Sequence, residues 1–598
     1  MIHPVVQGFA PLAGQQCTVT GTGTVARVAA DHLRRLGAAV RADRADRAAV
    51  GGAAAEGTGP PPAARLRAAG STGPAGPSGA AEVLVRWADA LPAELVHDET
   101  SAQAVCGLMH VHGRRHGRPR ALRVDVAATA AAVLATTALL ARLHADEPRG
   151  ERHPALSTGV DRAALTLAAH HLAVGGSDGG PPAAAPGGPP FRSAEGTWFE
   201  IEALAAEGWA AFWAALGAPR EAARDGWRSF ADRFTTAVAP LPRALHAATR
   251  RHRWAQLRGR ADRCGVSVCA VAAAAPGPPS DPWLLRTGPR PHPLHARRPL
   301  HAPAGRSPGA APEPLAGVVV LEVGRRIQGP LAAHLLRLLG ADVVRVEPPG
   351  GDPMRGAPPL CGEGSAVWLA FNHGKRAVEL DLKQAHGQRQ LAELVRDADV
   401  LLHNWAPATA LRLGLDSAAV HRVNPVLVHA HTSGWSDAVP DPPLATDYMV
   451  QAHSGLADAL RADPAEPPRP TLLTPLDSLG GMLGAQAVVA GLLHRDRTGR
   501  GSAVETSLLA AARLLLEPLT RRGSPPRPVR RDPVRDGGGR WTTAPCDAPG
   551  RPGAVPVTTS LRPSDLPAAL AAVTTTSADG CVLPPRPWAT AAGRSDRR

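Results

Sequence analysis

Short apolar runs recur in the second half of the chain, and longer segments whose apolar positions repeat every three to four residues lie between them. The runs are residues 318–323, 342–347, 399–404 and 426–431. Apolar runs of this length are typical of strands buried on both faces, whereas the segments between them have helical periodicity. The alternation predicts an α/β fold, with a mainly parallel, Rossmann-like sheet flanked by helices.

The same pattern occurs a second time in the first half. Residues 25–41 parallel residues 329–345, because each stretch has an amphipathic helix, a Leu-Gly pair that stops it, and a strand. Residues 106–144 parallel residues 454–495 in the same way, and each ends in a long apolar helix. Asp125 and Asp477 precede these two helices at the matching position. The sequence therefore predicts a duplicated fold.

Stretches rich in Pro and Gly divide the chain. Residues 276–314 contain too much proline to supply a regular element, so we expect a linker there. Residues 190–275 have a strand, several helical segments and a closing strand, which is the pattern of a smaller α+β domain. The expected order is a degenerate large domain (1–175), the small domain (190–275), the linker (276–314), an intact large domain (315–520), and a truncated small domain with a disordered Pro/Arg-rich tail (521–598).

Composition argues against several classes of protein. The net charge is +14, but the basic residues are scattered arginines, Lys375 and Lys383 are the only lysines, and aromatics make up 3%. So few stacking platforms argue against a nucleic-acid partner. The seven cysteines form no CxxC pair, which suits a reducing cytoplasm. We expect no membrane span, because the most apolar segments contain Arg, His or Asp, and we expect no signal peptide.

Asp477 is the first candidate for chemistry. A carboxylate at a helix N-cap accepts backbone N–H bonds at the positive end of the helix dipole, and both effects favour the ionised form. Gly480 and Gly481 are expected to leave it open to a ligand. An ionised carboxylate beside free amides can act as a nucleophile, with the amides stabilising an oxyanion. On local sequence alone, however, an aspartate before an apolar helix is most often only a cap.

Residues 315–347 and 470–515 resemble the family III CoA-transferases, which include formyl-CoA transferase, carnitine CoA-transferase and α-methylacyl-CoA racemase. The resemblance is close over about 314–545 and weak over 17–275. In that family, an aspartate at the position of Asp477 attacks an acyl-CoA thioester, and the returning CoA thiolate gives an aspartyl-CoA thioester. The resemblance implies transfer of CoA between an acyl-CoA and a carboxylic acid. Coenzyme A or acyl-CoA would then be a substrate, with no tightly bound cofactor and no metal.

Residues 370–383 and 403–414 resemble family loops that, with the loop around Gln328, wrap the adenine and phosphates of CoA. Carried over by position, the CoA-binding residues are Gln328, Lys375, Leu380, Asn404 and Arg412. Arg and Lys suit phosphate, although a solvated strand entry is the alternative for Lys375. Two departures stand out, since Pro348-Pro349 replaces a basic residue of many relatives and Pro407-Ala408 replaces a usual Pro-Gly. The histidines at 421, 429 and 431 are expected to be satisfied by backbone groups and packing rather than to bind metal.

Two alternatives remain open. A catalytically inactive homologue that binds CoA or serves as a scaffold is favoured by the truncated second small domain. A racemase or isomerase is disfavoured, because racemase relatives have a His-Asp pair where this chain has Thr446-Asp447. Family members form interlocked dimers, so the chain is expected to be either a homodimer or an internal pseudo-dimer in which the first half supplies the partner fold. The expected location is the cytoplasm.

Overall fold

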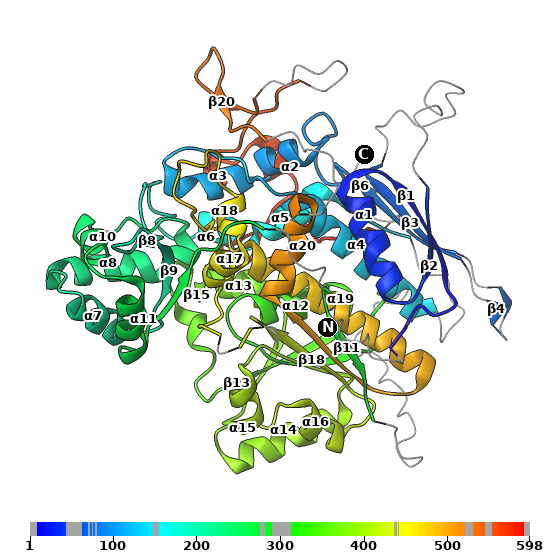
Figure 1. The fold of residues 1–598 in the computed structure, drawn as a ribbon. Coiled ribbons are helices and arrows are strands. Elements are labelled where there is room, and N and C mark those ends of the chain that lie inside the picture. Colours follow the sequence, from blue (N-terminus) through cyan, green and yellow to red (C-terminus); the bar gives the residue numbers. More distant parts are fainter. Residues whose placement is uncertain are drawn as a thin grey trace.

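The computed structural model describes residues 9–43, 62–69, 72–73, 76–77, 80–146, 155–275, 281–289, 313–435, 439–440, 442–520, 530–544 and 553–590. These residues form two large sheets, one from each half of the chain, with long helices between them (Figure 1). The α/β fold predicted from the alternating pattern is therefore confirmed.

The sheet of the second half has seven strands. Their order is β11 (Leu284–Thr287), β19 (Ser502–Ser507), β18 (Val428–Ser433), β17 (Val400–His403), β12 (Val319–Val323), β13 (Asp342–Glu347) and β16 (Arg376–Glu379). Every neighbouring pair is parallel except β11 with β19. The four apolar runs of the sequence form β12, β13, β17 and β18, which is the Rossmann-like arrangement that they predicted.

Helices cover both faces of this sheet (Figure 1). On one face lie α12 (Gln328–Leu338) and α19 (Pro475–Thr498), and on the other lie α14 (Ala385–Asp397), α15 (Pro407–Arg412) and α16 (Ser417–Val423). Successive strand residues point to opposite faces. Val320 accordingly packs in the core under α12 and α19, and its neighbour Leu321 packs in a separate core on the other face.

The sheet of the first half differs from the prediction. Its order is β2 (Ala39–Asp43), β1 (Gln16–Gly21), β3 (Ala64–Ala68), β6 (Ala81–Arg86), β7 (Leu156–Gly159) and β24 (Ala589–Thr590). The pairs β1–β2 and β6–β7 are parallel, but β3 runs antiparallel to both of its neighbours and β24 runs antiparallel to β7. This sheet is therefore mixed rather than mainly parallel.

The internal repeat is visible in matching helices. In the first half α1 (Gly23–Arg35) precedes β2, as α12 precedes β13. Both helices stop at the expected Leu-Gly pair, with Gly37 at φ 97° and Gly340 at φ 104°. Only glycine adopts such angles without strain, so the shared stop signal has a physical basis.

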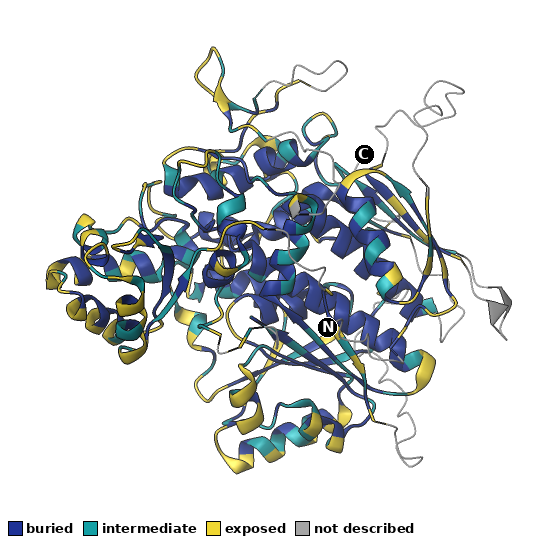
Figure 2. Ribbon diagram, in the orientation of Figure 1, coloured by how far each residue is buried: buried dark blue, intermediate teal, exposed yellow. Residues whose placement is uncertain are grey.

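The two longest helices meet in the middle of the molecule. α4 (Val126–Asp146) packs along α19, and both are almost wholly buried (Figure 2). By length and composition each could cross a membrane, contrary to our expectation, but all of the most apolar stretch of α4 and 94% of that of α19 lie inside the fold. Their apolar surface is used as the common core of the two halves.

Two segments expected to lack regular structure contribute strands. β11 lies within the expected linker, and β24 lies within the expected disordered tail. Each is short and lies at the edge of a sheet. β11 pairs with β19 of the second half, and β24, near the end of the chain, pairs with β7 of the first half. Residues 276–280 and 290–312 of the expected linker lie outside the described residues.

A smaller α+β unit follows the first large sheet. Strands β8 (Phe191–Arg192), β9 (Trp198–Glu202) and β10 (Ser267–Ala270) form an antiparallel sheet, covered by α7 (Ala206–Ala215), α8 (Arg220–Ala231), α10 (Arg243–Thr249) and α11 (Trp254–Arg263). Trp209, Trp213 and Phe212 fill its separate core. Strands β9 and β10 contact α17 (Asp447–Ser454) of the second half. The unit therefore belongs to the first half in sequence but docks on the second half (Figure 1).

Candidate active site

Asp477 lies in the first turn of α19, three residues after the N-cap. The helix begins at Pro475 after Thr474, whose backbone is left-handed with φ 52°. The carboxylate that binds the first amides is instead that of Asp447, the first residue of α17. Its Oδ2 accepts the N–H of Leu476 at 2.7 Å and that of Asp477 at 2.8 Å. Asp447 therefore performs the capping role that the sequence had assigned to Asp477.

Because Asp447 rather than Asp477 binds these amides, the ionisation expected of Asp477 also changes. Among the described residues no group donates a hydrogen bond to its carboxylate, and the amides beside it are already used. Burial, and next the charge of Asp447, raise the pKa of Asp477 well above its ordinary value, while Arg326 opposes the shift. Burial also raises the pKa of Asp447, to about 6. The surroundings therefore oppose the ionisation that the helix start was expected to favour, because a buried second carboxylate lies next to Asp477.

Gly480 and Gly481 serve close packing. A Cβ on Gly480 would lie 2.7 Å from Nε2 of Gln328, and one on Gly481 would lie 2.8 Å from the backbone oxygen of Gln328. Both glycines lie on the helix face of Asp477, three and four residues further on. Gln328 also donates to the Ser433 carbonyl at 3.2 Å. The glycines thus bring Gln328 to the helix face that bears Asp477, rather than simply exposing that carboxylate.

The small α+β unit supplies another carboxylate near Asp477. Glu202, at the end of β9, accepts a hydrogen bond from Thr446 Oγ1 at 2.8 Å and from Arg233 at 3.0 Å. Its charge also contributes to the raised pKa of Asp477. Sequence reasoning missed Glu202, because no local signal connects a strand of the first half with a helix 240 residues away. Thr446, which stands where racemase relatives have histidine, is an ordinary hydroxyl donor here.

Asn404 is hydrogen-bonded to the loop that precedes α12. The side chain of Asn404, after β17, accepts from the Arg325 N–H and donates to the Arg325 carbonyl, both at 2.8 Å. Gly329 permits the approach, since a Cβ there would lie 3.2 Å from Asn404 Cγ. The Arg325 guanidinium lies over the Trp405 ring, 4.4 Å from its centre. The structure therefore brings Gln328 and Asn404 together, with the exposed Arg325 beside them.

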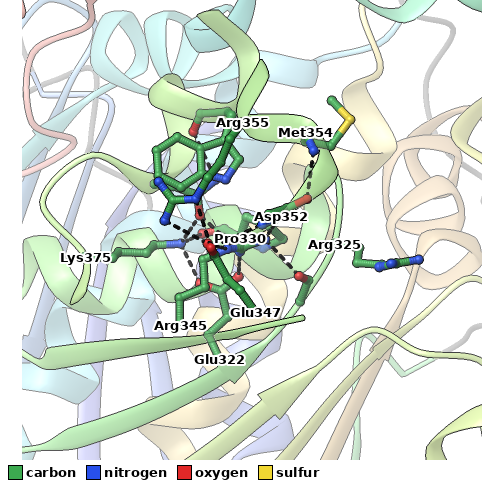
Figure 3. A network of polar contacts seen from close by, with 12 residues as sticks. Glu322, Arg325, Pro330, Arg345, Glu347, Asp352, Met354, Arg355 and Lys375 are labelled. Carbon is green, nitrogen blue, oxygen red and sulfur yellow. Dashed lines mark hydrogen bonds and ion pairs between the residues drawn. The ribbon is translucent and has the colours of Figure 1, made fainter. Parts of the chain in front are cut away.

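Lys375 belongs to a buried ionic network (Figure 3). Its Nζ donates to Glu322 at 2.7 Å, to the Pro330 carbonyl at 2.8 Å and to Asn372 at 2.9 Å, which uses all three protons of the ammonium. Only 1% of the side chain is exposed. This arrangement does not agree with direct binding of a phosphate by Lys375, nor with the solvated alternative.

The centre of the network is Arg345, on β13. It is paired with Glu322, Glu347 and Asp352, three carboxylates that converge on one guanidinium. Arg355 pairs with the other side of Glu347 and lies over the Trp368 ring. Together with Lys375, the three cations balance the three anions. The turn 352–355 is thereby fixed at the end of the strand.

Leu380 and Arg412 lie in different surroundings. The Leu380 side chain is buried in the core under α14, and its N–H donates to the Glu347 carbonyl. Arg412 is exposed at the end of α15, and its hydrogen-bond partner among the described side chains is Thr409 of the same helix. Of the five expected CoA residues, the structure brings Gln328 and Asn404 together, places Lys375 against Pro330 of the same helix turn in a buried network, and leaves Leu380 and Arg412 apart from them.

The histidines behave as expected. His421 and His429 bind the carbonyls of Leu427 and Leu415, and His431 binds the Trp405 carbonyl at 3.0 Å. Over the residues described, no three His, Cys, Asp or Glu side chains are placed to hold a metal ion.

The first half carries a matching arrangement that has no carboxylate at the position of Asp477. Glu99 accepts the N–H groups of Ala127 and Ala128 at 3.0 and 2.7 Å, as Asp447 accepts those of Leu476 and Asp477. Each acid also binds a glutamine four residues later, Gln103 or Gln451. By this geometry the counterpart of Asp477 is Ala128. The expected equivalence of Asp125 was therefore wrong.

Asp125 is held by residues from elsewhere in the chain. Thr24 donates to it at 2.6 Å, and Arg530 pairs with it at 2.8 Å. Arg530 follows α20 (Leu508–Thr520), so the second half places this guanidinium against the helix start of the first half. Arg530 also donates to the carbonyls of Leu122 and Val124.

Comparison with known proteins agrees with the two related halves. The model of CoA-transferase family III matches residues 93–278 and 315–548, and so most of the chain. The chain belongs to CoA-transferase family III. The separate matches to the family agree with the predicted tandem duplication.

Each of three relatives in this family matches between 33% and 40% of the chain. Succinate–glutarate CoA-transferase of Agrobacterium fabrum is 34% identical over 205 residues, covering 33% of this chain and 51% of the relative. Acetyl-CoA:oxalate CoA-transferase of Acetobacter aceti is 32% identical, covering 34% and 52%. A probable fatty acyl-CoA transferase of Mycobacterium tuberculosis is 32% identical, covering 40% and 62%. The chain thus spans about half the length of the curated relatives it matches.

Among solved structures, a CAIB/BAIF family protein from Brucella suis is 28% identical and covers 41% of this chain and 65% of its own, with a TM-score of 0.35.

Proposed function

We propose that this chain transfers CoA between an acyl-CoA and a carboxylic acid, and that Asp477 is the nucleophile. The observation that carries the proposal is the start of α19, where Asp447 and Gln328 surround Asp477 in a family III fold. Membership of the family supports CoA transfer in general, and the assignment of Asp477 rests on its position and surroundings.

The reaction needs four displacements at carbonyl carbons. The Asp477 carboxylate attacks the thioester of the donor, which gives a mixed anhydride and releases CoA thiolate. The thiolate attacks the aspartyl carbonyl, which forms an aspartyl-CoA thioester and releases the donor acid. The acceptor carboxylate then attacks this thioester and releases the thiolate again. Finally the thiolate attacks the acceptor carbonyl, which yields the new acyl-CoA and regenerates the Asp477 carboxylate.

Oxyanion stabilisation must come from outside the first turn of α19. Asp447 already binds the amides of Leu476 and Asp477, so these are not available to a substrate. We assign the role to the Gln328 side-chain amide, which lies against Gly480. A hydrogen-bond donor at this place would stabilise the negative charge that develops on the attacked carbonyl.

We assign the binding of the adenine and phosphates of CoA to Asn404, Arg325 and Arg412. Arg325 and Arg412 are exposed cations that suit phosphate, and Asn404 orients the Arg325 loop. Lys375 and Leu380 would not contact CoA directly, but would hold the ends of β12 and β16 in place.

The small α+β unit of the first half would close over the acyl group. It reaches the second half through Glu202 and Thr446, although its sequence precedes Asp477 by more than 200 residues. The first half would then supply within one chain what a second subunit supplies in an interlocked dimer. This removes the main reason for expecting an inactive homologue, which was the truncation of the second small domain. We place the activity in the cytoplasm.

Intact-mass spectrometry tests this function. The full chain is incubated with succinyl-CoA, glutaryl-CoA, oxalyl-CoA and a long-chain acyl-CoA, which are chosen from the relatives, and is quenched with hydroxylamine. We expect a hydroxamate on Asp477 with at least one donor, absent in Asp477→Asn and retained in the matched control Asp125→Asn. CoA binding with no adduct from any donor would support a scaffold. Exchange of the α-proton with solvent would support a racemase.

A further inference from the structure

A cavity of about 750 Å³ lies between the two halves, along the side of α12. Its walls come from α12, from α13 (Ala366–Asn372), from α5 (Val160–Leu167), and from residues 583–590 near the end of the described chain. Volumes of 300–1,000 Å³ are usual for small-molecule sites. It is separate from the candidate active site, because none of its lining residues surrounds Asp477.

Two guanidiniums face this cavity with unused donors. Arg162 donates from Nε to Asp89 at 2.7 Å and from Nη1 to the Arg586 carbonyl at 2.8 Å. Arg586 donates from Nη2 to Glu313 at 2.8 Å and to the Leu338 carbonyl at 3.0 Å. Among the described residues, Nη2 of Arg162 and Nη1 of Arg586 have no acceptor.

The charges around the cavity balance, but its two guanidiniums keep donors. Asp89 is shared between Arg162 and Arg86, which pairs with it at 3.1 Å, and the buried Asp161 accepts the N–H of Asp89 at 2.9 Å. With Glu313, three carboxylates stand against three guanidiniums. The attraction for a ligand therefore comes from the unused Nη groups, since Arg binds carboxylates with particular geometric specificity.

Another polar group in the wall lacks a partner. His334, on α12, is 6% exposed, and its Nδ1 is buried without a hydrogen bond. The wall beside His334 is apolar, with Leu331, Leu335 and Leu338 on the same helix and Trp588 opposite.

We propose that this cavity binds an organic carboxylate with an apolar body. The carboxylate is held by Arg162 and Arg586, and the apolar body lies along the leucines of α12. This site is independent of the CoA transfer proposed above.

Isothermal titration calorimetry of the full chain with octanoate tests the proposal. We expect saturable binding of one equivalent. Arg586→Met should weaken it about tenfold or more, since a hydrogen bond to a charged group is lost. Octanol should bind at least tenfold more weakly than octanoate. Arg540→Met is the matched control, because Arg540 is an exposed cation paired with Asp536 outside the cavity.

A second variant tests the location without removing charge. Leu335→Phe adds volume inside the cavity and should also weaken binding, whereas Asp477→Asn should leave it unchanged. The proposal is overturned if octanoate does not bind, if octanol binds equally well, or if binding survives both Arg586→Met and Leu335→Phe. A loss of octanoate binding in Asp477→Asn would instead place the ligand in the candidate active site.

Discussion

The proximity of Asp447 and Asp477 predicts that two substitutions shift the pKa of Asp477 in opposite directions. Oδ2 of Asp447 lies 2.8 Å from the backbone N of Asp477. Covalent geometry then separates the two carboxylate charges by roughly 5–6 Å. At an effective dielectric constant of about 20 their repulsion is about 3 kcal/mol. Asp447→Asn removes this repulsion and should lower the pKa of Asp477.

The proposed nucleophile must be ionised, so the rate falls as the pH falls through the pKa of Asp477. Asp447→Asn should therefore move the acid limb of the pH dependence of kcat/KM to lower pH. Arg326→Met should move it to higher pH, because Arg326 opposes the raised pKa. The assay is the rate of CoA transfer, or of hydroxamate formation, between pH 4 and 9.

Glu99→Gln is the matched control. Glu99 makes the same two amide contacts at α4 and has no reactive carboxylate beside it, so the pH profile should stay as in the wild type. An acid limb that does not move in Asp447→Asn, or that moves in the same direction in both variants, would refute the reasoning. Far-UV circular dichroism checks that the variants are folded.

Three further predictions concern stability. Arg345→Met leaves buried carboxylates without their cation and should lower the free energy of unfolding by about 3–5 kcal/mol, which would be seen as faster amide exchange in β12 and β13. Arg376→Met removes a cation from an exposed ion pair and should cost less than about 1 kcal/mol. Equal rates of amide exchange in the two variants would contradict this prediction. Burial raises the pKa of Glu99 from 4.5 to about 7. Between those pH values only the folded state holds the proton, so the free energy of unfolding falls as the pH rises. Calorimetry should show that this dependence of stability on pH is weaker in Glu99→Gln, and an unchanged dependence would refute the prediction. Gly259→Ala, on α11, should gain up to about 1 kcal/mol, because its Cβ would make an ordinary contact with Arg263 Nη1 at 3.6 Å. Gly480→Ala should lose stability, because its Cβ would lie 2.7 Å from Gln328 Nε2. A higher melting temperature for Gly480→Ala would contradict the packing argument.

Local pattern was sufficient for much of the second half. The apolar runs at 318–323 and 342–347 and the Leu-Gly stop at Gly340 have near-neighbour causes, and all were predicted correctly. The short strands β11 and β24 were missed, because their residues pair only with partners far away in sequence. The prolines that indicated a linker lie on either side of β11, and the strand residues Leu284–Thr287 contain none.

The site was predicted less completely than the fold. The position of Asp477 was read correctly as the start of a helix, but its ionisation depends on Asp447, 30 residues earlier, and on Glu202 from the other half. Lys375 resembles a phosphate ligand in sequence, yet Glu322 and Asn372 enclose it. In each case the decisive neighbour is brought in by tertiary packing, which no local pattern records.

The placement of β11 and β24 has a consequence for dividing the molecule. Each sheet takes an edge strand from a segment outside the two stretches that match the family model, 93–278 and 315–548. Producing residues 315–548 by itself would leave β19 without β11, and producing residues 93–278 by itself would leave β7 without both of its neighbours, β6 and β24. Unpaired strand edges recruit other strands and promote aggregation. Any attempt to study the halves as separate proteins should therefore carry residues 281–289 with the second half and residues 553–590 with the first.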